Sequence, residues 1–397
     1  MNRPLTVVVG MSGGVDSSVS ALLLKEQGYH VIGMFMKNWD EHDDSGACSA
    51  TKDYEDVARV CDKIKIPYYS VNFVNEYKEH VFSNFLTEFQ AGHTPNPDIL
   101  CNREIKFKML LDKALEIGAD FLATGHYCQN VLLNDEHQLL KGKDPQKDQS
   151  YFLYAMPGSA LKNVLFPIGS LLKSEVRAIA KKHQLATAEK KDSTGICFIG
   201  KRDFKEFLSG YISAQPGNFE DLNGKVVGKH DGVAFYTIGQ RKGLKIGGEG
   251  DAWFVVEKDI SRNVVVLAQG EQHPALFCDD LIATDLNWIS PNGPPTLPFR
   301  CKAKVRYRQQ DQECLVTKID DKQIHVAFLV PQRAVTLQQS VVLYHGDTCL
   351  GGGIITSRGE SYYNRLGREE ETKDIKDIKD IRDIRDIKDK GPKGQGT

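Results

Sequence analysis

Short apolar runs alternate with amphipathic stretches along the first third of the chain. The runs are rich in Val, Ile and Phe, which is typical of buried strands, and the stretches between them have helical spacing. Consecutive strands separated by helices need crossover connections, so they form a parallel sheet with helices on both faces, a doubly wound α/β fold. The predicted strands are 5–9, 31–36, 68–73 and 121–124, and the predicted helices are 21–27, 54–65, 76–89 and 105–117.

After about residue 205 the pattern changes to short strands punctuated by glycine and proline. Their spacing predicts an all-β unit, a small barrel or a sandwich, of which we expect the barrel. The predicted strands are 253–257, 264–268, 301–307, 314–319, 324–328, 340–344 and 352–355. We therefore predict an α/β domain at 1–205, a small mixed central domain at 206–270, a C-terminal β-barrel at 271–358 and a charged tail at 359–397.

The tail repeats Lys/Arg-Asp-Ile every three residues. Each step of three falls about 60° short of a helical turn, so the isoleucines do not form a continuous apolar face. Low complexity of this kind predicts a solvated segment that is disordered or only transiently helical.

The link between the first strand and the first helix is rich in glycine and serine, and runs from Gly10 to Ser18. Glycines let the backbone approach an anion, while serine hydroxyls and a helix N-terminus donate hydrogen bonds to it. A P-loop would need Lys and Ser/Thr where Val15 and Asp16 stand. The SGGxDS pattern instead resembles the pyrophosphate-binding loop of the ATP pyrophosphatases, which split ATP between its α- and β-phosphates and adenylate an oxygen atom. A turn without a ligand is the alternative.

Two other segments are predicted to end at the same edge of the sheet as this loop. Met36 closes the second strand and Gly125 follows the last one. Ligands of doubly wound sheets bind outside the carboxyl ends of the strands. Met36 and Gly125 are therefore candidate adenosine contacts, although either position also suits ordinary strand-end packing.

Composition limits the function classes. The chain has 397 residues, and its 51 Lys and Arg against 53 Asp and Glu give a net charge of −2, so a nucleic acid would be held by local basic patches rather than by a global field. The N-terminal sequence lacks a secretory signal and no apolar run has the length of a membrane span, which predicts a cytoplasmic protein without membrane contact. The nine cysteines predict reduced thiols rather than a disulfide framework.

Two cysteines have distinctive surroundings. Cys101 follows a segment with two prolines, Thr94–Leu100, and precedes a helical pattern, whereas Cys197 lies in a polar stretch that begins with Lys190 and Lys191. A helix start or nearby lysines lower a thiol pKa from about 8.5 and favour the reactive thiolate. The alternative is that each is a small buried hydrophobic residue.

The motifs together resemble those of the bacterial tRNA-specific 2-thiouridylases, from about Thr6 to Ile355. They are GMSGGVDSS, FMKNW, TPNPDILCNREIKFK, ATGHY, KDQSYFLY, KKDSTGICFIG, IGQRKGL and CLGGGII. This family places sulfur at C2 of the wobble uridine, U34, of certain tRNAs. The resemblance implies that Cys101 and Cys197 are catalytic and form a redox disulfide with each other. It also implies ATP contacts at Gly10, Met11, Ser12, Gly13, Gly14, Val15, Asp16, Ser17, Met36 and Gly125, target-base contacts at Asn96, Pro97 and Asp98, and tRNA contacts at Lys147, Asp148, Gln149, Arg306 and Tyr307.

The chemistry of such a reaction needs two stages, because the C2 carbonyl oxygen of uridine is a poor leaving group. We expect O2 to attack the α-phosphate of ATP, with Mg²⁺ neutralising the leaving pyrophosphate and Asp16 as a candidate ligand. A persulfide on Cys197, loaded by a cysteine desulfurase or sulfur relay protein, would then deliver sulfur to C2. Cys101 would release the thiolated RNA and leave a disulfide, while Asp98 shuttles protons. Release of hydrosulfide from Cys197, with Cys101 assisting, fits the sequence equally well.

The target base must be splayed out of its stack to reach such a site, which costs a few kcal/mol. Contacts to the RNA backbone would offset this cost. The candidate contacts are a group of cations near aromatic residues, which on their own are ordinary surface charges: Lys141, Lys143, Lys147, Arg306 and Arg308, with Tyr151, Phe152, Tyr154 and Tyr307.

Two rival functions remain open at this stage. One is another ATP pyrophosphatase that adenylates a different RNA base or a small metabolite, although no glutaminase domain is visible in the sequence. The other is a noncatalytic RNA-binding adaptor, against which Ser12, Asp16, Cys101 and Cys197 all count. Because the sequence has no CxxC pair, we predict neither an iron–sulfur cluster nor a four-cysteine zinc site.

Overall fold

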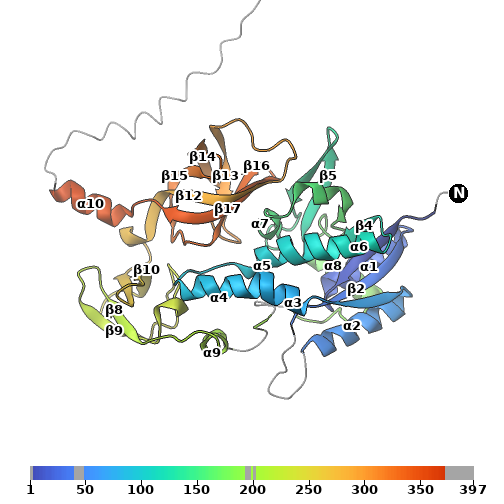
Figure 1. Cartoon of the computed structure of the whole chain (residues 1–397), viewed down its shortest axis with the longest axis horizontal. Helices are drawn as coiled ribbons and strands as arrows, with labels where there is room; N and C mark the ends of the chain where they lie inside the picture. Colours follow the sequence, from blue (N-terminus) through green and yellow to red (C-terminus); the bar gives the residue numbers. More distant parts are fainter. Residues whose placement is uncertain (1–2, 40–48, 193–197, 200–202, 372–397) are drawn as a thin grey trace, which may run out of the picture.

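The computed structural model describes residues 3–39, 49–192, 198–199 and 203–371 (Figure 1). Cys197 and the Lys/Arg-Asp-Ile repeat therefore lie outside the described residues. Within the described part of the chain, no helix is both long enough and apolar enough to cross a membrane.

The first domain contains a five-stranded sheet in the order β3-β2-β1-β4-β7. Every neighbouring pair of strands is parallel. The predicted parallel sheet is confirmed, with one additional short strand, β7, at its edge. The strands are β1 (Thr6–Met11), β2 (His30–Lys37), β3 (Tyr68–Asn72), β4 (Phe121–Ala123) and β7 (Val164–Leu165).

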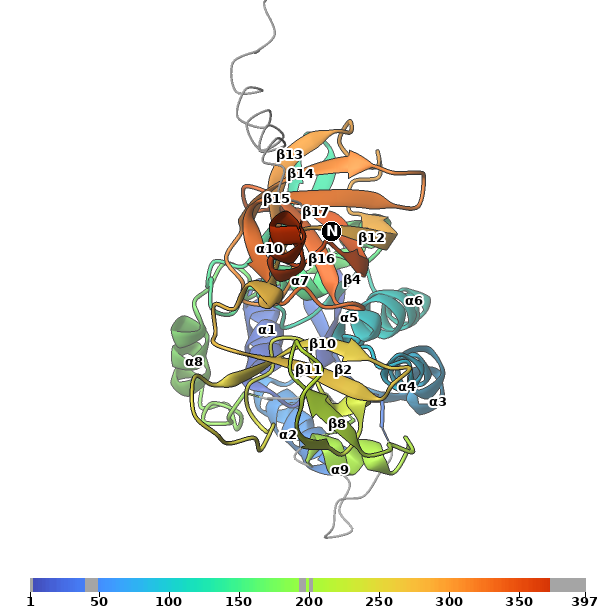
Figure 2. The same cartoon turned by 90° about the vertical axis from the view of Figure 1, so that its left-hand side faces the viewer.

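Helices cover both faces of this sheet (Figure 2). Successive residues of a strand point to opposite faces. Val7 and Val9 accordingly pack in one core cluster with residues of α1, α2 and α8, whereas Val8 packs in a second cluster with residues of the helices between β3 and β4. The first group is α1 (Val15–Glu26), α2 (Ser49–Ile64) and α8 (Lys173–Lys182), and the second is α3 (Val74–Tyr77), η1 (Lys78–Phe82), α4 (Ser83–Gln90), α5 (Pro97–Leu100), η2 (Cys101–Leu110) and α6 (Leu111–Glu116).

The last helical segment begins earlier than the predicted Ile105. The backbone N–H of Asp98 donates to Asn96 Oδ1 over 3.2 Å, and Pro97 occupies the first helical position, where its missing N–H has no cost. From Cys101 the helix continues as a π-helix, η2. π-helical turns are rare and frequently occur at functional sites.

The central domain is built on a four-stranded mixed sheet in the order β10-β11-β8-β9. Its core contains Phe219, Val255 and Leu267, all fully buried. The predicted strands at 253–257 and 264–268 are confirmed, and two further strands precede them. The elements are α9 (Phe204–Ser209), β8 (Gly217–Glu220), β9 (Val226–His230), η4 (Val233–Phe235), β10 (Trp253–Asp259) and β11 (Val264–Gln269).

The C-terminal domain is a closed six-stranded barrel. Its strands follow the order β12-β15-β14-β13-β16-β17, and pairing of β12 with β17 closes the ring. This confirms the predicted barrel, but the longest strand, β12, is absent from the prediction. The elements are η5 (Pro274–Leu276), β12 (Phe277–Trp288), β13 (Phe299–Lys304), β14 (Gln312–Lys318), β15 (Ile324–Arg333), β16 (Ser340–His345) and β17 (Thr348–Arg358).

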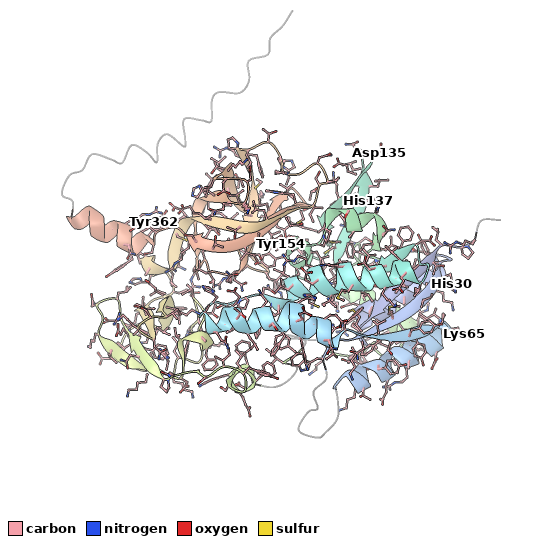
Figure 3. The ribbon with its side chains drawn as sticks, in the orientation of Figure 1. His30, Lys65, Asp135, His137, Tyr154 and Tyr362 are labelled. Carbon is pink, nitrogen blue, oxygen red and sulfur yellow. The ribbon has the colours of Figure 1, made fainter. Side chains whose placement is uncertain are left out.

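The first domain and the barrel share a sheet and a buried polar interface. The hairpin of β5 (Cys128–Leu133) and β6 (Glu136–Lys141) extends the barrel sheet, because Leu140 pairs with Thr348 at the start of β17. The helix α7 (Ser150–Leu153) and η3 (Gly158–Asn163) follow this hairpin. Tyr154, labelled in Figure 3, lies at this interface, and its hydroxyl is 2.9 Å from Ser340 Oγ on β16.

The first part of the charged tail is helical. Within the segment 359–397, whose repeat is predicted to be disordered or only transiently helical, Tyr362–Glu371 form the helix α10. The helix packs against the barrel because Arg365 donates both guanidinium Nη groups to the Asp279 carboxylate, and the Tyr362 hydroxyl lies 3.3 Å from the same carboxylate. The low-complexity repeat lies beyond this anchored helix.

Candidate functional site

The segment from Gly10 to Ser18 turns from β1 into α1 as predicted. Gly13 has a φ of 74°, and a Cβ atom there would lie 2.7 Å from the carbonyl oxygen of Asp53, so the turn needs glycine. The Ser17 hydroxyl accepts from the backbone N–H of Ser12 over 3.2 Å, which holds the turn closed. No described side chain caps the N-terminus of α1 at Gly14. The first-turn N–H groups of this helix therefore suit an anion such as a phosphate.

Gly125, at the end of β4, lies directly against this helix start. A Cβ atom there would be 2.7 Å from the backbone nitrogen of Ser17. Met36, at the end of β2, is half-buried and packs against the core cluster that contains Cys101. The segment Gly10–Ser18 is called the phosphate loop below. The two predicted adenosine contacts lie at the same edge of the sheet as this loop, because β1, β2 and β4 are parallel neighbours.

Asp16 is bound by a lysine that the sequence analysis missed. Lys173 Nζ lies 2.8 Å from each carboxylate oxygen of Asp16, and the Tyr127 hydroxyl donates to Oδ1, also over 2.8 Å. The carboxylate is therefore engaged by protein donors in this conformation, rather than arranged as the expected Mg²⁺ ligand. Among the described residues, no group of three or more His, Cys, Asp or Glu side chains is placed to hold a metal ion.

Lys173 also connects the phosphate loop to Asp192, which directly precedes the undescribed segment 193–197. Asp192 accepts from Lys147, Lys173 and Arg177 at 2.7, 2.8 and 2.8 Å. Burial raises the pKa of Asp192, but hydrogen bonds from Lys147 and Lys173 outweigh it and lower the value to about 2. Lys147, predicted to contact tRNA, is thus held by an ion pair at this position.

Cys101, one of the two predicted catalytic thiols, is the first residue of η2 and is only 2% exposed. Asp98, one turn earlier, is half-buried. Burial raises the pKa of its carboxyl group, and the positive charge of Lys106 partly opposes this. Burial thus favours the protonated form of Asp98 more than in an exposed aspartate, which suits a residue that exchanges protons.

A polar chain next to Cys101 connects it to the phosphate loop. Lys106 Nζ donates to Asn102 Oδ1 over 2.9 Å and lies 3.5 Å from His126 Nε2. His126 follows Gly125, and its Nδ1 lies 2.8 Å from the Thr124 hydroxyl. Burial holds the pKa of His126 well below its usual value, so the ring is neutral. Two motifs contain this group, TPNPDILCNREIKFK with Asn102 and Lys106 and ATGHY with His126, but the sequence analysis assigned no role to these three residues.

The predicted pairing of Cys101 with Cys197 is not tested, since Cys197 lies outside the described residues. Phe198 and Ile199, which follow it, are buried in the same core cluster as Cys101. The remaining described cysteines are buried and form no disulfide with one another: Cys61, Cys128, Cys278, Cys301, Cys314 and Cys349.

Most of the predicted tRNA contacts are engaged within the protein. Asp148 is 6% exposed and accepts from the backbone of Gly142 and Ser150 at 3.1 Å. Gln149 accepts from the backbone of Tyr127, and Arg306 donates to the carbonyl oxygens of Ile238 and Ala334. Tyr307 packs its ring 4.4 Å from that of Phe152. Of these contacts, the one between Tyr307 and Phe152 joins the barrel to the first domain, whereas those of Arg306 join the barrel to the central domain.

Comparison with known proteins agrees with this arrangement. Three family models match consecutive parts of the chain: the tRNA methyl transferase HUP domain at 5–201, the tRNA methyl transferase PRC-barrel domain at 205–269 and the aminomethyltransferase beta-barrel domain at 278–355. The tRNA-specific 2-thiouridylase MnmA of Protochlamydia amoebophila is 63% identical over 366 residues, which cover 92% of this chain and 97% of that protein. The chain belongs to the tRNA-specific 2-thiouridylase family.

Other comparisons extend this result. The 2-thiouridylase of Shouchella clausii is 59% identical over 349 residues, covering 88% of this chain and 96% of that protein. Among solved structures, the U34-tRNA thiolase NcsA from Methanococcus maripaludis with its [4Fe-4S] cluster has a TM-score of 0.33 and 20% identity, covering 49% of this chain and 62% of that one. A structural likeness this low carries no argument, so the 2-thiouridylase assignment rests on sequence.

Proposed function

We propose that the protein is a tRNA sulfurtransferase that converts the wobble uridine U34 into 2-thiouridine at the expense of ATP. The observation that carries this proposal is a continuous set of contacts between two chemically distinct parts of the site. Gly125 abuts the phosphate loop at Ser17, His126 follows it, and Lys106 joins His126 to Asn102, next to Cys101. These contacts support the proposal that ATP binds near the Cys101 thiol at one edge of the sheet, as activation followed by sulfur transfer requires.

The first stage is activation of the base. The N-terminal amide groups of α1 and the hydroxyls of Ser12 and Ser17 bind the pyrophosphate part of ATP, while Met36 and Gly125 contact the adenosine. Uridine O2 attacks the α-phosphate, and pyrophosphate leaves. A bound Mg²⁺ would neutralise charge on the leaving pyrophosphate. We propose no protein ligand for it, because Lys173 and Tyr127 engage Asp16.

Recognition of the base is assigned to the turn before Cys101. Asn96 and Pro97 shape the start of α5, and Asp98 projects from its first turn. We propose that these residues receive a uridine flipped out of the anticodon loop, with Asp98 as the proton shuttle. Arg308 is exposed beside Tyr307 and is free to meet RNA phosphate, and Lys147 can do so if it leaves Asp192.

The second stage is sulfur transfer. The terminal sulfur of a Cys197 persulfide attacks C2, and AMP leaves with the former O2 atom. The Cys101 thiolate then attacks Sγ of Cys197 and breaks the sulfur–sulfur bond, which releases 2-thiouridine and leaves a Cys101–Cys197 disulfide for a thiol reductant. The persulfide comes from a separate donor protein, a cysteine desulfurase or relay protein. In the alternative order, Cys101 attacks Sγ before transfer and frees hydrosulfide, which attacks C2.

A sulfur-transfer assay tests the proposal directly. Radiolabelled sulfur is supplied through a cysteine desulfurase to the full chain with ATP, Mg²⁺ and tRNA lacking the modification. We expect label at U34 and formation of AMP with the wild type, and no label with Cys101→Ser or Cys197→Ser. If ATP is converted to AMP without labelled tRNA, the substrate is another base or a metabolite. If neither occurs, the protein is a binding adaptor. A cytoplasmic location, where these substrates occur, forms part of the same proposal.

A further inference from the structure

The turn from His93 to Asn96, which leads into Pro97 and Asp98, is held by side chains from both other domains. Its first residue, His93, is tied to α4, because its N–H donates to the Glu88 carbonyl oxygen over 2.9 Å. Its last residue, Asn96, caps α5. Thr94 lies between these two anchors and forms hydrogen bonds with the central domain and with the barrel.

The barrel supplies one of these contacts. Gln339 Nε2 donates to the carbonyl oxygen of Thr94 over 2.5 Å. Gln339 precedes β16, and its own carbonyl oxygen accepts from the backbone N–H of Ile355 on β17 over 2.8 Å. The donor is therefore fixed to two barrel strands, so its position follows that of the barrel.

The central domain supplies the other contact. The hydroxyl groups of Thr94 and Thr237 lie 3.3 Å apart. Thr237 belongs to a tight turn, since its N–H donates to Gln240 Oε1 over 3.0 Å, and the Gln240 carbonyl oxygen accepts from Val255 on β10, also over 3.0 Å. These two hydrogen bonds fix the turn that carries the Thr237 hydroxyl to the sheet of the central domain.

A third interaction joins these two supports to each other. Arg306 Nη2 donates to Ile238, next to Thr237, and to Ala334 and the Thr336 hydroxyl, which precede Gln339. The three distances are 2.8, 2.8 and 3.1 Å. Gly239 allows this close approach, because a Cβ atom there would lie 2.7 Å from that of Ala334. The central domain and the barrel therefore present their hydrogen-bonding groups to Thr94 as one unit.

We propose that Gln339 and Thr237 are positioning residues, which hold Thr94 so that Asn96, Pro97 and Asp98 meet the flipped uridine in the reactive geometry. This inference rests on the proposed function and deepens it. The target-base site is complete only when all three domains are docked, although none of its predicted contact residues belongs to the central domain or the barrel. A displacement of about 1 Å at a reacting group is enough to cost up to 100-fold in rate, so two hydrogen bonds on the supporting turn are significant.

The variants are chosen to remove a donor without changing shape. Gln339→Glu keeps the size of the side chain but replaces its donor with an acceptor, which cannot bind a carbonyl oxygen when ionised. Thr237→Val removes the hydroxyl, and Thr237→Ser keeps it. Gln272→Glu makes the same chemical change as Gln339→Glu at an exposed position and serves as the matched control.

The full chain is assayed for thiolation of tRNA at saturating tRNA and ATP. We expect kcat to fall about tenfold in Gln339→Glu and in Thr237→Val, with KM for ATP unchanged and the melting temperature lowered by no more than about 4 °C. Thr237→Ser and Gln272→Glu should retain wild-type kcat. A kcat in Gln339→Glu equal to that of Gln272→Glu overturns the proposal, as does a kcat that falls only because the variant is unfolded at the assay temperature.

Two further measurements make the result specific. In a double-mutant cycle, Thr94→Val combined with Thr237→Val should be no slower than either single variant, since one shared contact is lost, and simple additivity would contradict the pairing. Hydrogen exchange of the peptide 92–99 should accelerate in Gln339→Glu and not in Gln272→Glu. This readout needs no catalysis. If the wild type fails to thiolate tRNA but the exchange difference is present, the proposed function is wrong and the positioning of the turn still stands.

Discussion

Replacing Lys173 by methionine removes the cation that joins the phosphate loop to Asp192. The ammonium group is 2.8 Å from Asp16 and 2.8 Å from Asp192, and the lysine side chain is only 12% exposed. Methionine keeps most of the volume of the aliphatic stem, so the change is mainly one of charge. Asp16 would retain the Tyr127 hydroxyl, and Asp192 would retain Lys147 and Arg177.

The size of the effect follows from burial. Exposed ion pairs contribute 0–1 kcal/mol, whereas breaking a buried pair costs about 3–5 kcal/mol. Lys173 is nearly buried but both carboxylates are 31% exposed, so we expect a loss of about 2–3 kcal/mol in the free energy of unfolding. Lys143→Met provides the matched control, because Lys143 and Glu175 are 3.4 Å apart and 51% and 43% exposed. Its cost should stay below about 1 kcal/mol.

Urea denaturation of the two variants measures this difference. The pKa of Asp192 is lowered to about 2, against about 3.9 in an unfolded chain, so its stabilising contribution is complete above pH 4 and is lost as the pH falls towards 2. The Lys173→Met deficit should therefore shrink over that range. The negative charge left on Asp16 should also raise KM for ATP. Equal stability of Lys173→Met and Lys143→Met at pH 7 would refute the reasoning.

Three other predictions concern the interface, the proton shuttle and the tail. Ser340→Ala leaves the buried Tyr154 hydroxyl without its side-chain partner and should cost about 1–3 kcal/mol, much of which should be recovered by adding Tyr154→Phe; calorimetry that shows an additive loss would contradict this. Asp98→Asn should abolish thiolation yet stabilise the fold at pH 7, because burial raises the pKa of this carboxyl group and disfavours its ionised form. This gain in the free energy of unfolding should disappear as the pH falls to about 4, because the carboxyl group then becomes protonated in both states. Unfolding curves at both pH values measure it. Deletion of residues 368–397 should leave the thiolation rate nearly unchanged, and a large loss would show that the repeat acts in the reaction.

Local pattern was enough to predict the sheet of the first domain but not all of the barrel. Val7, Val8 and Val9 of β1 are fully buried, so the sequence predicted this central strand from an unbroken apolar run. In β12, register shifts at Cys278/Asp280 and Thr284/Asn287 break the alternation of apolar and polar residues. The sequence of this strand therefore lacks the regular pattern from which a strand is predicted. The docking of β6 on β17 depends on contacts across about 200 residues of sequence, which no local pattern encodes.

The same distinction applies to the site. The phosphate loop is contiguous, so its residues could be predicted together. Lys173 was not predicted as a site residue because its role depends on Asp16, 157 residues away in the sequence. Lys106 was not predicted because it acts through Asn102 and His126. The domain limits and the Cys101–Cys197 disulfide stay predictions, the latter because Cys197 lies outside the described residues.

The shared sheet of hairpin and barrel has a consequence for synthesis of the chain. The β5–β6 hairpin leaves the ribosome about 200 residues before Thr348, the residue with which Leu140 pairs. At roughly 5–20 residues per second this is an interval of about 10–40 s. During that time β6 presents an unpaired strand edge, and the exposed apolar side chains of Val131, Leu132 and Leu133 lie on the strand beside it. The nascent chain is consequently most open to aggregation after its nucleotide-binding half has been made and before its last strand arrives.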